Sequence, residues 1–216
     1  MIKSFSIINL ACLVLITSVQ LFAQENGGRK RVEGISTDIF TEFAPTISAD
    51  GNTMILESNR NETKNAERWE LFESRKKEDG NWSEPIAITA INEKCNFVAG
   101  PSLSYDGNRI YFTAVIEGVN ESEDIFYSDR LSETLWSEPI SVGGPVNTDD
   151  YEGFPSISAD SKFLYFIRIN YDNPEDKKSK ETCFEIYVSR KQADGKWGEP
   201  EKLPEQINTG CVRDPR

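Results

Sequence analysis

Residues 45–51 read Pro-Thr-Ile-Ser-Ala-Asp-Gly, and the pattern returns as Pro-Ser-Leu-Ser-Tyr-Asp-Gly at 101–107 and as Pro-Ser-Ile-Ser-Ala-Asp-Ser at 155–161. The spacings between the copies are 56 and 54 residues. A second marker follows each copy with nearly the same period, as Trp82-Ser-Glu-Pro85, Trp136-Ser-Glu-Pro139 and Trp197-Gly-Glu-Pro200. A period of about 40 to 50 residues or slightly more, filled with short β-patterns, is typical of propeller blades. We therefore expect a repeat protein rather than an enzyme domain with a single core.

The second copy shows how one repeat makes four strands. A strand at 100–104 opens beside a proline, Asp106-Gly107 suits a tight hairpin turn, and 109–115 is rich in β-branched and aromatic residues. An alternating strand at 124–130 and a last strand at 136–142 complete it. The same reading gives strands at 44–48, 53–59, 69–76 and 82–89 in the first copy, and at 154–158, 162–169, 184–191 and 197–203 in the third.

These strands predict an all-β fold, a β-propeller-type array of three four-stranded antiparallel blades. The blades are expected at 44–89, 100–142 and 154–203, and 204–216 is expected to start a fourth, which makes a partial or open propeller. The recurrent tryptophan is interpreted as a core ring that fills the gap between neighbouring blades.

Several of these motifs together resemble a known family. They are Pro-x-Ile-Ser-Ala-Asp-Gly-Asn followed by Ser58-Asn59-Arg60, Asp124-Ile-Phe-Tyr-Ser-Asp-Arg130, Gly-x-Trp-x-Glu-Pro, and the Asn-Thr pair before each new blade. The chain from 35 to 216 is similar to the WD40-like propeller repeats of the Tol-B type, which are abundant in bacterial envelope proteins. The resemblance implies a propeller fold and an envelope location. The Ser-Asn-Arg motif stands only in the first copy, so a family role for its arginine extends to one blade.

The first 23 residues are expected to be a signal peptide. Lys3 precedes an apolar run, and Leu21-Phe-Ala23 is followed by polar residues. A transmembrane anchor is the alternative, but Thr17, Ser18 and Gln20 break the run before it reaches the 18 or so residues that a span needs. Cys12 suggests a lipoprotein signal, although Asn9 occupies a position that favours an aliphatic residue. Residues 24–34 are expected to be a flexible segment.

Composition excludes several function classes. The chain has 24 Lys and Arg against 36 Asp and Glu, so its formal charge is -12, or -13 once Lys3 is removed (-12 - 1). Nucleic acid and anionic membrane surfaces are poor partners for such a chain. Without histidine there is no Ser-His-Asp triad and no histidine zinc site. No cofactor is expected. Cys95, Cys183 and Cys211 remain after the signal, and their spacing does not select a disulfide pair. Three Asn-x-Ser/Thr triplets, at 61, 81 and 120, leave a eukaryotic secreted protein as a weaker alternative.

The end of the chain resembles the entrance to another blade, because 207–216 aligns with 146–155. Propellers close with about four to eight blades. The chain is therefore either part of a longer propeller, or two copies form a homodimer of three blades each that closes a ring.

Function is expected on the rim that carries the connections between the second and third strands, at 60–68, 117–123 and 171–182. Candidate partner-binding residues on this rim are Glu42, Arg60, Asp150, Tyr151 and Glu152, although these residues could simply solvate the surface. The sequence favours an exported, non-catalytic scaffold that binds a protein or glycan in the periplasm or outer envelope. A secreted hydrolase that cleaves glycans with paired carboxylates is the alternative. Asp149, Asp150 and Glu152 are candidate calcium ligands, but the sequence has no Asp-x-Asp-x-Asp-Gly loop.

Overall fold

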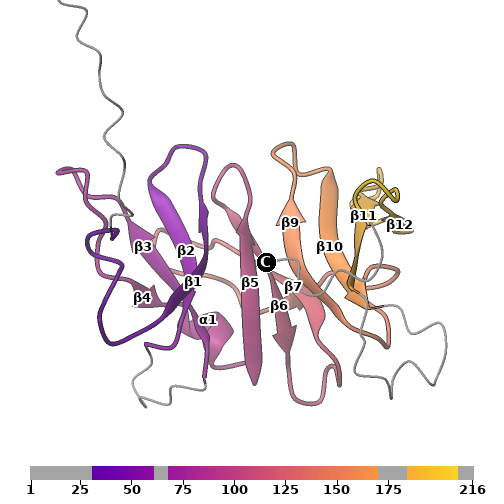
Figure 1. The fold of residues 1–216 in the computed structure, drawn as a ribbon, viewed down its shortest axis with the longest axis horizontal. Helices are drawn as coiled ribbons and strands as arrows, with labels where there is room; N and C mark the ends of the chain where they lie inside the picture. Colours follow the sequence, from indigo (N-terminus) through magenta and orange to yellow (C-terminus); the bar gives the residue numbers. More distant parts are fainter. Residues whose placement is uncertain (1–30, 61–67, 170–183, 209–216) are drawn as a thin grey trace, which may run out of the picture. The chain divides into compact units, whose positions relative to one another are not determined.

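The computed structural model describes residues 31–60, 68–169 and 184–208. Outside these residues lie the predicted signal peptide, Cys183, Cys211, most of the loop at 60–68, all of the loop at 171–182, and most of the segment at 204–216. In the described part, nearly all regular structure is β, in three four-stranded antiparallel sheets (Figure 1). The first sheet contains β1 (Glu42–Ile47), β2 (Thr53–Ser58), β3 (Glu70–Arg75) and β4 (Ile86–Ala87). The second contains β5 (Phe97–Leu103), β6 (Arg109–Val115), β7 (Asp124–Asp129) and β8 (Ile140–Ser141). The third contains β9 (Glu152–Ile157), β10 (Phe163–Ile169), β11 (Phe184–Arg190) and β12 (Glu201–Lys202).

The predicted fold class is confirmed: each sheet is a meander in chain order, as expected of a propeller blade. We call the three sheets blade 1, blade 2 and blade 3. The helix of the described residues, α1 (Thr89–Asn92), lies in the link between blades 1 and 2. No helix in the described residues is long and apolar enough to cross a membrane.

The outermost strand of each blade is shorter than predicted. Trp82, Trp136 and Trp197 each form a single bridge to the end of the third strand, and pairing resumes only after the Glu-Pro step. Proline has no N–H to donate to the neighbouring strand, so Pro85, Pro139 and Pro200 interrupt the ladder.

The hairpin between the first two strands is built alike in all three blades. In blade 1 the Asp50 carboxylate accepts hydrogen bonds from the Ser48 hydroxyl at 2.5 Å and from the Asn52 amide at 3.0 Å. Asp106 and Asp160 repeat the arrangement. The residue after the aspartate has a positive φ, 72° at Gly51 and 57° at Ser161, which explains the preference for Asp-Gly here.

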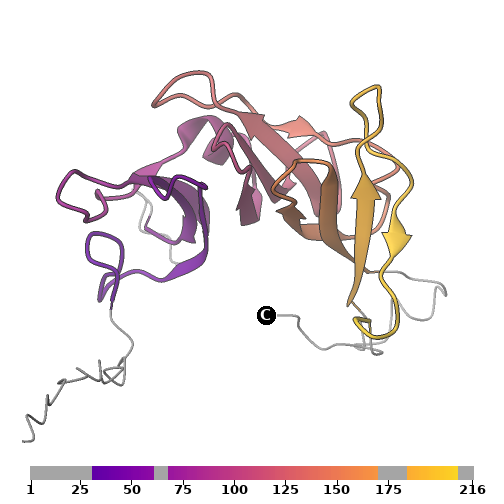
Figure 2. The same ribbon diagram turned by 90° about the horizontal axis from the view of Figure 1, so that it is seen from above.

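The blades pack through two apolar clusters in which the repeat tryptophans take part. Trp136 of blade 2 is 3% exposed and packs with Ile55, Leu71 and Ile88 of blade 1 and its link. Trp197 of blade 3 is 7% exposed and meets Tyr111 of blade 2 edge-on, with ring centroids 6.2 Å apart. Blade 2 thus lies between blades 1 and 3, and the sheets do not close into a ring (Figure 2).

The links between blades carry a repeated asparagine clamp. The side chain of Asn147 accepts the N–H of Ile125 at 3.0 Å and donates to its carbonyl at 2.9 Å. Asn92 does the same to Leu71, and Asn208 to Ile186. In each case the asparagine of the Ile/Val-Asn motif binds the third strand of the blade before it. Asn92 and Asn147 thereby fix where blades 2 and 3 begin.

Candidate functional site

Glu42 and Arg60 lie together at the rim of blade 1. The Arg60 guanidinium donates to the Glu42 carboxylate at 2.5 Å and to the carbonyl of Ile35 at 2.6 Å. It also lies 6.0 Å from the ring centres of Phe40 and Phe72. The side chains are only 9% and 16% exposed. Both predicted residues therefore tie the entering segment to the blade.

Glu152 occupies the matching place in blade 3 and is fully buried. Its carboxylate accepts from the Thr148 amide at 2.8 Å, the Thr148 hydroxyl at 2.7 Å and the Arg168 Nε at 2.8 Å. Arg168 also donates to the carbonyl of Val146 at 2.8 Å. Burial raises the pKa of Glu152, against the opposing effect of these hydrogen bonds. A partner cannot reach this carboxylate without displacing the link between blades 2 and 3.

Asp150 and Tyr151 precede Glu152 directly and are half-buried. The Asp150 amide donates to the Thr148 hydroxyl at 3.2 Å, and the Asp150 carbonyl accepts from Ser122 at 2.9 Å. Tyr151 meets Phe184 edge-on, with centroids 5.7 Å apart, and burial raises the pKa of its hydroxyl. The structure thus brings Asp150, Tyr151 and Glu152 together in one segment, and places Glu42 and Arg60 together in another. Partner binding by the five residues stays a prediction.

Asp124, at the start of β7, is a carboxylate that sequence reasoning did not single out. One of its oxygens is buried and has no hydrogen-bond partner. Burial first, and then the charges of Glu152 and Asp149, raise the pKa of Asp124 to about 6. Raised carboxylate pKa values occur at catalytic sites and also in purely structural clusters. Among the described residues, no group of three or more His, Cys, Asp or Glu side chains could hold a metal ion. Asp149, Asp150 and Glu152, the candidate calcium ligands, do not form such a group.

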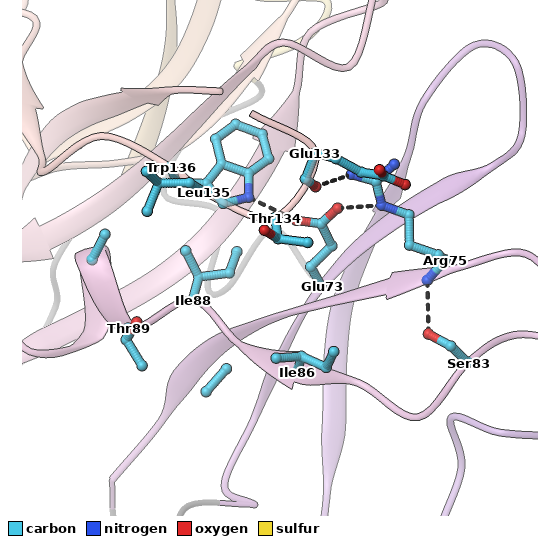
Figure 3. A pocket seen from close by; sticks show the side chains of 12 residues that line it. Glu73, Arg75, Ser83, Ile86, Ile88, Thr89, Glu133, Thr134, Leu135 and Trp136 are labelled. Carbon is cyan, nitrogen blue, oxygen red and sulfur yellow. Dashed lines mark hydrogen bonds and ion pairs between the residues drawn. The ribbon is translucent and has the colours of Figure 1, made fainter. Parts of the chain in front are cut away.

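Two hollows accompany blade 1. One of about 100 Å³ lies where blades 1 and 2 meet, lined by Glu73, Arg75, Ile86, Leu135 and Trp136 among others (Figure 3). There the Glu73 carboxylate already accepts from the Trp136 indole at 2.7 Å and from Arg75 at 2.7 Å. The other, of about 670 Å³, includes Arg60, Phe40, Phe72 and Glu93 in its wall, and its volume falls in the range of small-ligand sites.

Exposed aromatic side chains on the innermost strands were also missed. Phe43, Phe97 and Phe154 are 49%, 39% and 44% exposed. Phe154 lies against Gly100, whose φ is 58°, and a Cβ on that glycine would be 2.9 Å from the Phe154 ring. The signal in the sequence was a phenylalanine one or two residues before the recurrent Pro-x-Ile-Ser motif, at 154 and 43.

Comparison with solved structures supports the fold. A putative TolB from Agrobacterium tumefaciens is similar over 76% of this chain and 49% of its own, with a TM-score of 0.50 and 16% identity. A thermostable family-43 glycoside hydrolase is similar over 81% of this chain and 56% of its own, with a TM-score of 0.50 and 15% identity. TolB from Acinetobacter baumannii matches over 74% of this chain and 32% of its own, with a TM-score of 0.45 and 18% identity. The chain therefore spans between a third and a little over half of these proteins. No family model and no curated protein matches the sequence. At these identities the likeness shows a β-propeller-like fold and nothing about activity.

Proposed function

We propose that the chain is an exported, non-catalytic scaffold of the bacterial periplasm or outer envelope that binds a protein or glycan through its loop-bearing rim. The observation that carries the proposal is the use of the buried and half-buried carboxylates. Glu42, Glu73 and Glu152 are each held by an arginine, and Glu57 by the Gly100 amide at 2.8 Å. Acids used in this way stabilise blades, whereas a glycosidase needs two carboxyl groups facing a sugar.

Exposed groups remain on the rim for recognition. Glu117 and Glu121 are exposed in the loop between β6 and β7, and Asp149 is exposed in the link to β9. Long irregular connections on a rigid scaffold are where binding residues concentrate. The net charge of -12 favours a partner with basic or neutral polar groups.

The test is recovery of partners from an envelope extract and from a glycan array. The double variant Glu117→Gln with Glu121→Gln should lose binding without a change in melting temperature, since surface substitutions cost within about 0.5 kcal/mol. The matched control is Glu78→Gln with Glu133→Gln, which removes the same charge from exposed turns of the opposite rim. Equal recovery with both double variants would contradict rim recognition.

The hydrolase alternative rests on Asp124, whose raised pKa suits a general acid. Asp124→Asn decides it. If the purified chain hydrolyses a glycan, and Asp124→Asn abolishes turnover while the fold melts cooperatively, the enzyme replaces the scaffold. Absence of turnover on the glycans that the chain binds supports the scaffold.

A further inference from the structure

The two outer flanks of the array, on blade 1 and blade 3, carry the same contact positions as the interfaces inside it. We call the face that a blade turns toward the blade before it its leading face, or head, and the opposite face its trailing face, or tail. Each interface inside the array joins the leading face of one blade to the trailing face of the blade before it. At the first interface the Leu103 amide donates to the Thr46 hydroxyl at 3.1 Å. At the second, the Ile157 amide donates to the Ser102 hydroxyl at 3.1 Å. The geometry is repeated residue for residue.

Among the described residues, no blade lies against the trailing face of blade 3. Ile55, Tyr111 and Tyr165 occupy the same position on the second strand of the three blades. The first two are 0% and 1% exposed, and Tyr165 is 38% exposed. Ser156, the counterpart of Thr46 and Ser102, is also exposed. Ile186 and Val188, which pair with β10 on the same face, are only half-buried.

The leading face of blade 1 is open in the matching way. Ile47 is 50% exposed, whereas Leu103, at the same position in blade 2, is 6% exposed. Pro45 is exposed where Pro101 and Pro155 are buried. Trp82 is half-buried, and its counterparts Trp136 and Trp197 are buried.

The segment before β1 does not take the place of a missing blade. Ile35 is buried in the apolar cluster of blade 1, as Val146 is in that of blade 3. Arg60 donates to the Ile35 carbonyl, as Arg168 does to the Val146 carbonyl. The segment around Ile35 is thus a link of the interior kind. It packs against Trp82, and it leaves Ile47 exposed.

We infer that these flanks bind each other between two copies of the chain, head to tail. Ile47 of each copy would take the role of Ile157, and Ser156 of the other copy the role of Ser102. Made twice around a two-fold axis, the contact joins three blades to three, within the range of about four to eight for closed propellers. A second copy fits because the trailing face offers a hydroxyl and an apolar patch at the positions that the leading face uses inside the array. The inference does not depend on what the rim binds.

Sedimentation velocity over a concentration series from nanomolar to tens of micromolar tests the contact. The purified chain should be a dimer, and Ile47→Glu on the head and Tyr165→Glu on the tail should each raise its dissociation constant by about 100-fold, because each places a charge in an apolar contact. Val119→Glu is the matched control, since Val119 is 63% exposed in the loop between β6 and β7. It should leave the dimer unchanged.

Ser156→Arg provides a second tail variant on a side chain that is already exposed, in case Tyr165→Glu impairs folding. Far-ultraviolet circular dichroism checks that each variant is folded. A monomer at tens of micromolar would overturn the inference. So would a dimer that the tail variants dissociate and Ile47→Glu leaves intact, because that pattern belongs to a tail-to-tail contact.

Discussion

Replacement of Trp136 should weaken the packing of blade 1 against blade 2. The structure lets us divide the lost free energy of unfolding between burial of the ring and the hydrogen bond of its indole. The ring is 3% exposed and lies in the apolar cluster between the blades. Arg130 stacks over it, with the guanidinium carbon 4.0 Å from the ring centre. Truncation of a buried aromatic residue costs about 3 to 5 kcal/mol, so Trp136→Ala should lower the free energy of unfolding by that amount.

The indole N–H accounts for part of this cost. It donates to Glu73 at 2.7 Å, and Glu73 also accepts from Arg75 and Arg130. Trp136→Phe keeps an aromatic ring but removes this donor, and a hydrogen bond to a charged group contributes about 1.5 to 3 kcal/mol. Glu73 keeps its two arginines, so the lower end is expected. Trp197 meets Tyr111 and has no carboxylate acceptor among the described residues. Trp197→Phe should therefore cost less than about 1.5 kcal/mol.

Urea unfolding followed by far-ultraviolet circular dichroism measures these differences without relying on tryptophan fluorescence. Trp82→Ala serves as the internal control, because the half-buried Trp82 should cost only about 1 to 2 kcal/mol. Equal costs for Trp136→Phe and Trp197→Phe would refute the assignment of the difference to the Glu73 hydrogen bond. A cost of Trp82→Ala as large as that of Trp136→Ala would refute the view that the rings act between blades.

Three further predictions concern buried polar groups. Arg168→Met should cost about 3 to 5 kcal/mol, because it strands the buried charge of Glu152, and adding Glu152→Met should recover part of it in a urea double-mutant cycle. Asn147→Ala should cost about 2 kcal/mol by the same assay, and it should speed amide exchange in β7, because it frees both backbone groups of Ile125. Asp124→Asn should stabilise the fold at pH 7 by about 1 kcal/mol, after discounting for solvent, and hardly at all at pH 4. The folded-state pKa of Asp124 is about 6 against an ordinary value of 3.8, so its stability contribution falls as pH rises through that window. Equal effects at both pH values would contradict this origin.

Strands could be predicted closely from sequence because their signals are local. The predicted strand at 109–115 is β6 without change, and those at 53–59 and 124–130 differ from β2 and β7 by one residue. Turn chemistry fixed these ends, since Gly107 supplies the positive φ of 72° that the turn requires. The outermost strands were predicted too long, because the apolar residues after Trp136 suggested a strand and the effect of Pro139 on the ladder was not weighed.

The candidate site was harder to predict, because burial depends on contacts far apart in the chain. Glu152 and Arg168 lie in different strands, and their pairing follows from the register of β9 on β10. From the sequence, Glu152 looked like one member of an exposed acidic stretch. Asp124 was not singled out from the sequence, because the charges that raise its pKa lie far along the chain. Asp149 lies in the next link and Glu152 at the start of β9, so only the folded arrangement reveals the raised pKa.

The distribution of acids also narrows how the rim could work. Glu57 and Glu152 are buried, and Glu73 has a side chain only 11% exposed, so these acids contribute little to the field outside the protein. The external negative charge near the loops must then come from exposed residues such as Glu117, Glu121 and Asp149. A partner selected by charge should weaken as salt rises, since exposed charges are screened over about 10 Å at 0.1 M. A partner held by the exposed Phe43, Phe97 and Phe154 should instead resist salt, because burial of apolar surface does not depend on that screening. The salt dependence of binding therefore separates the two modes of recognition that the rim and the inner strands offer.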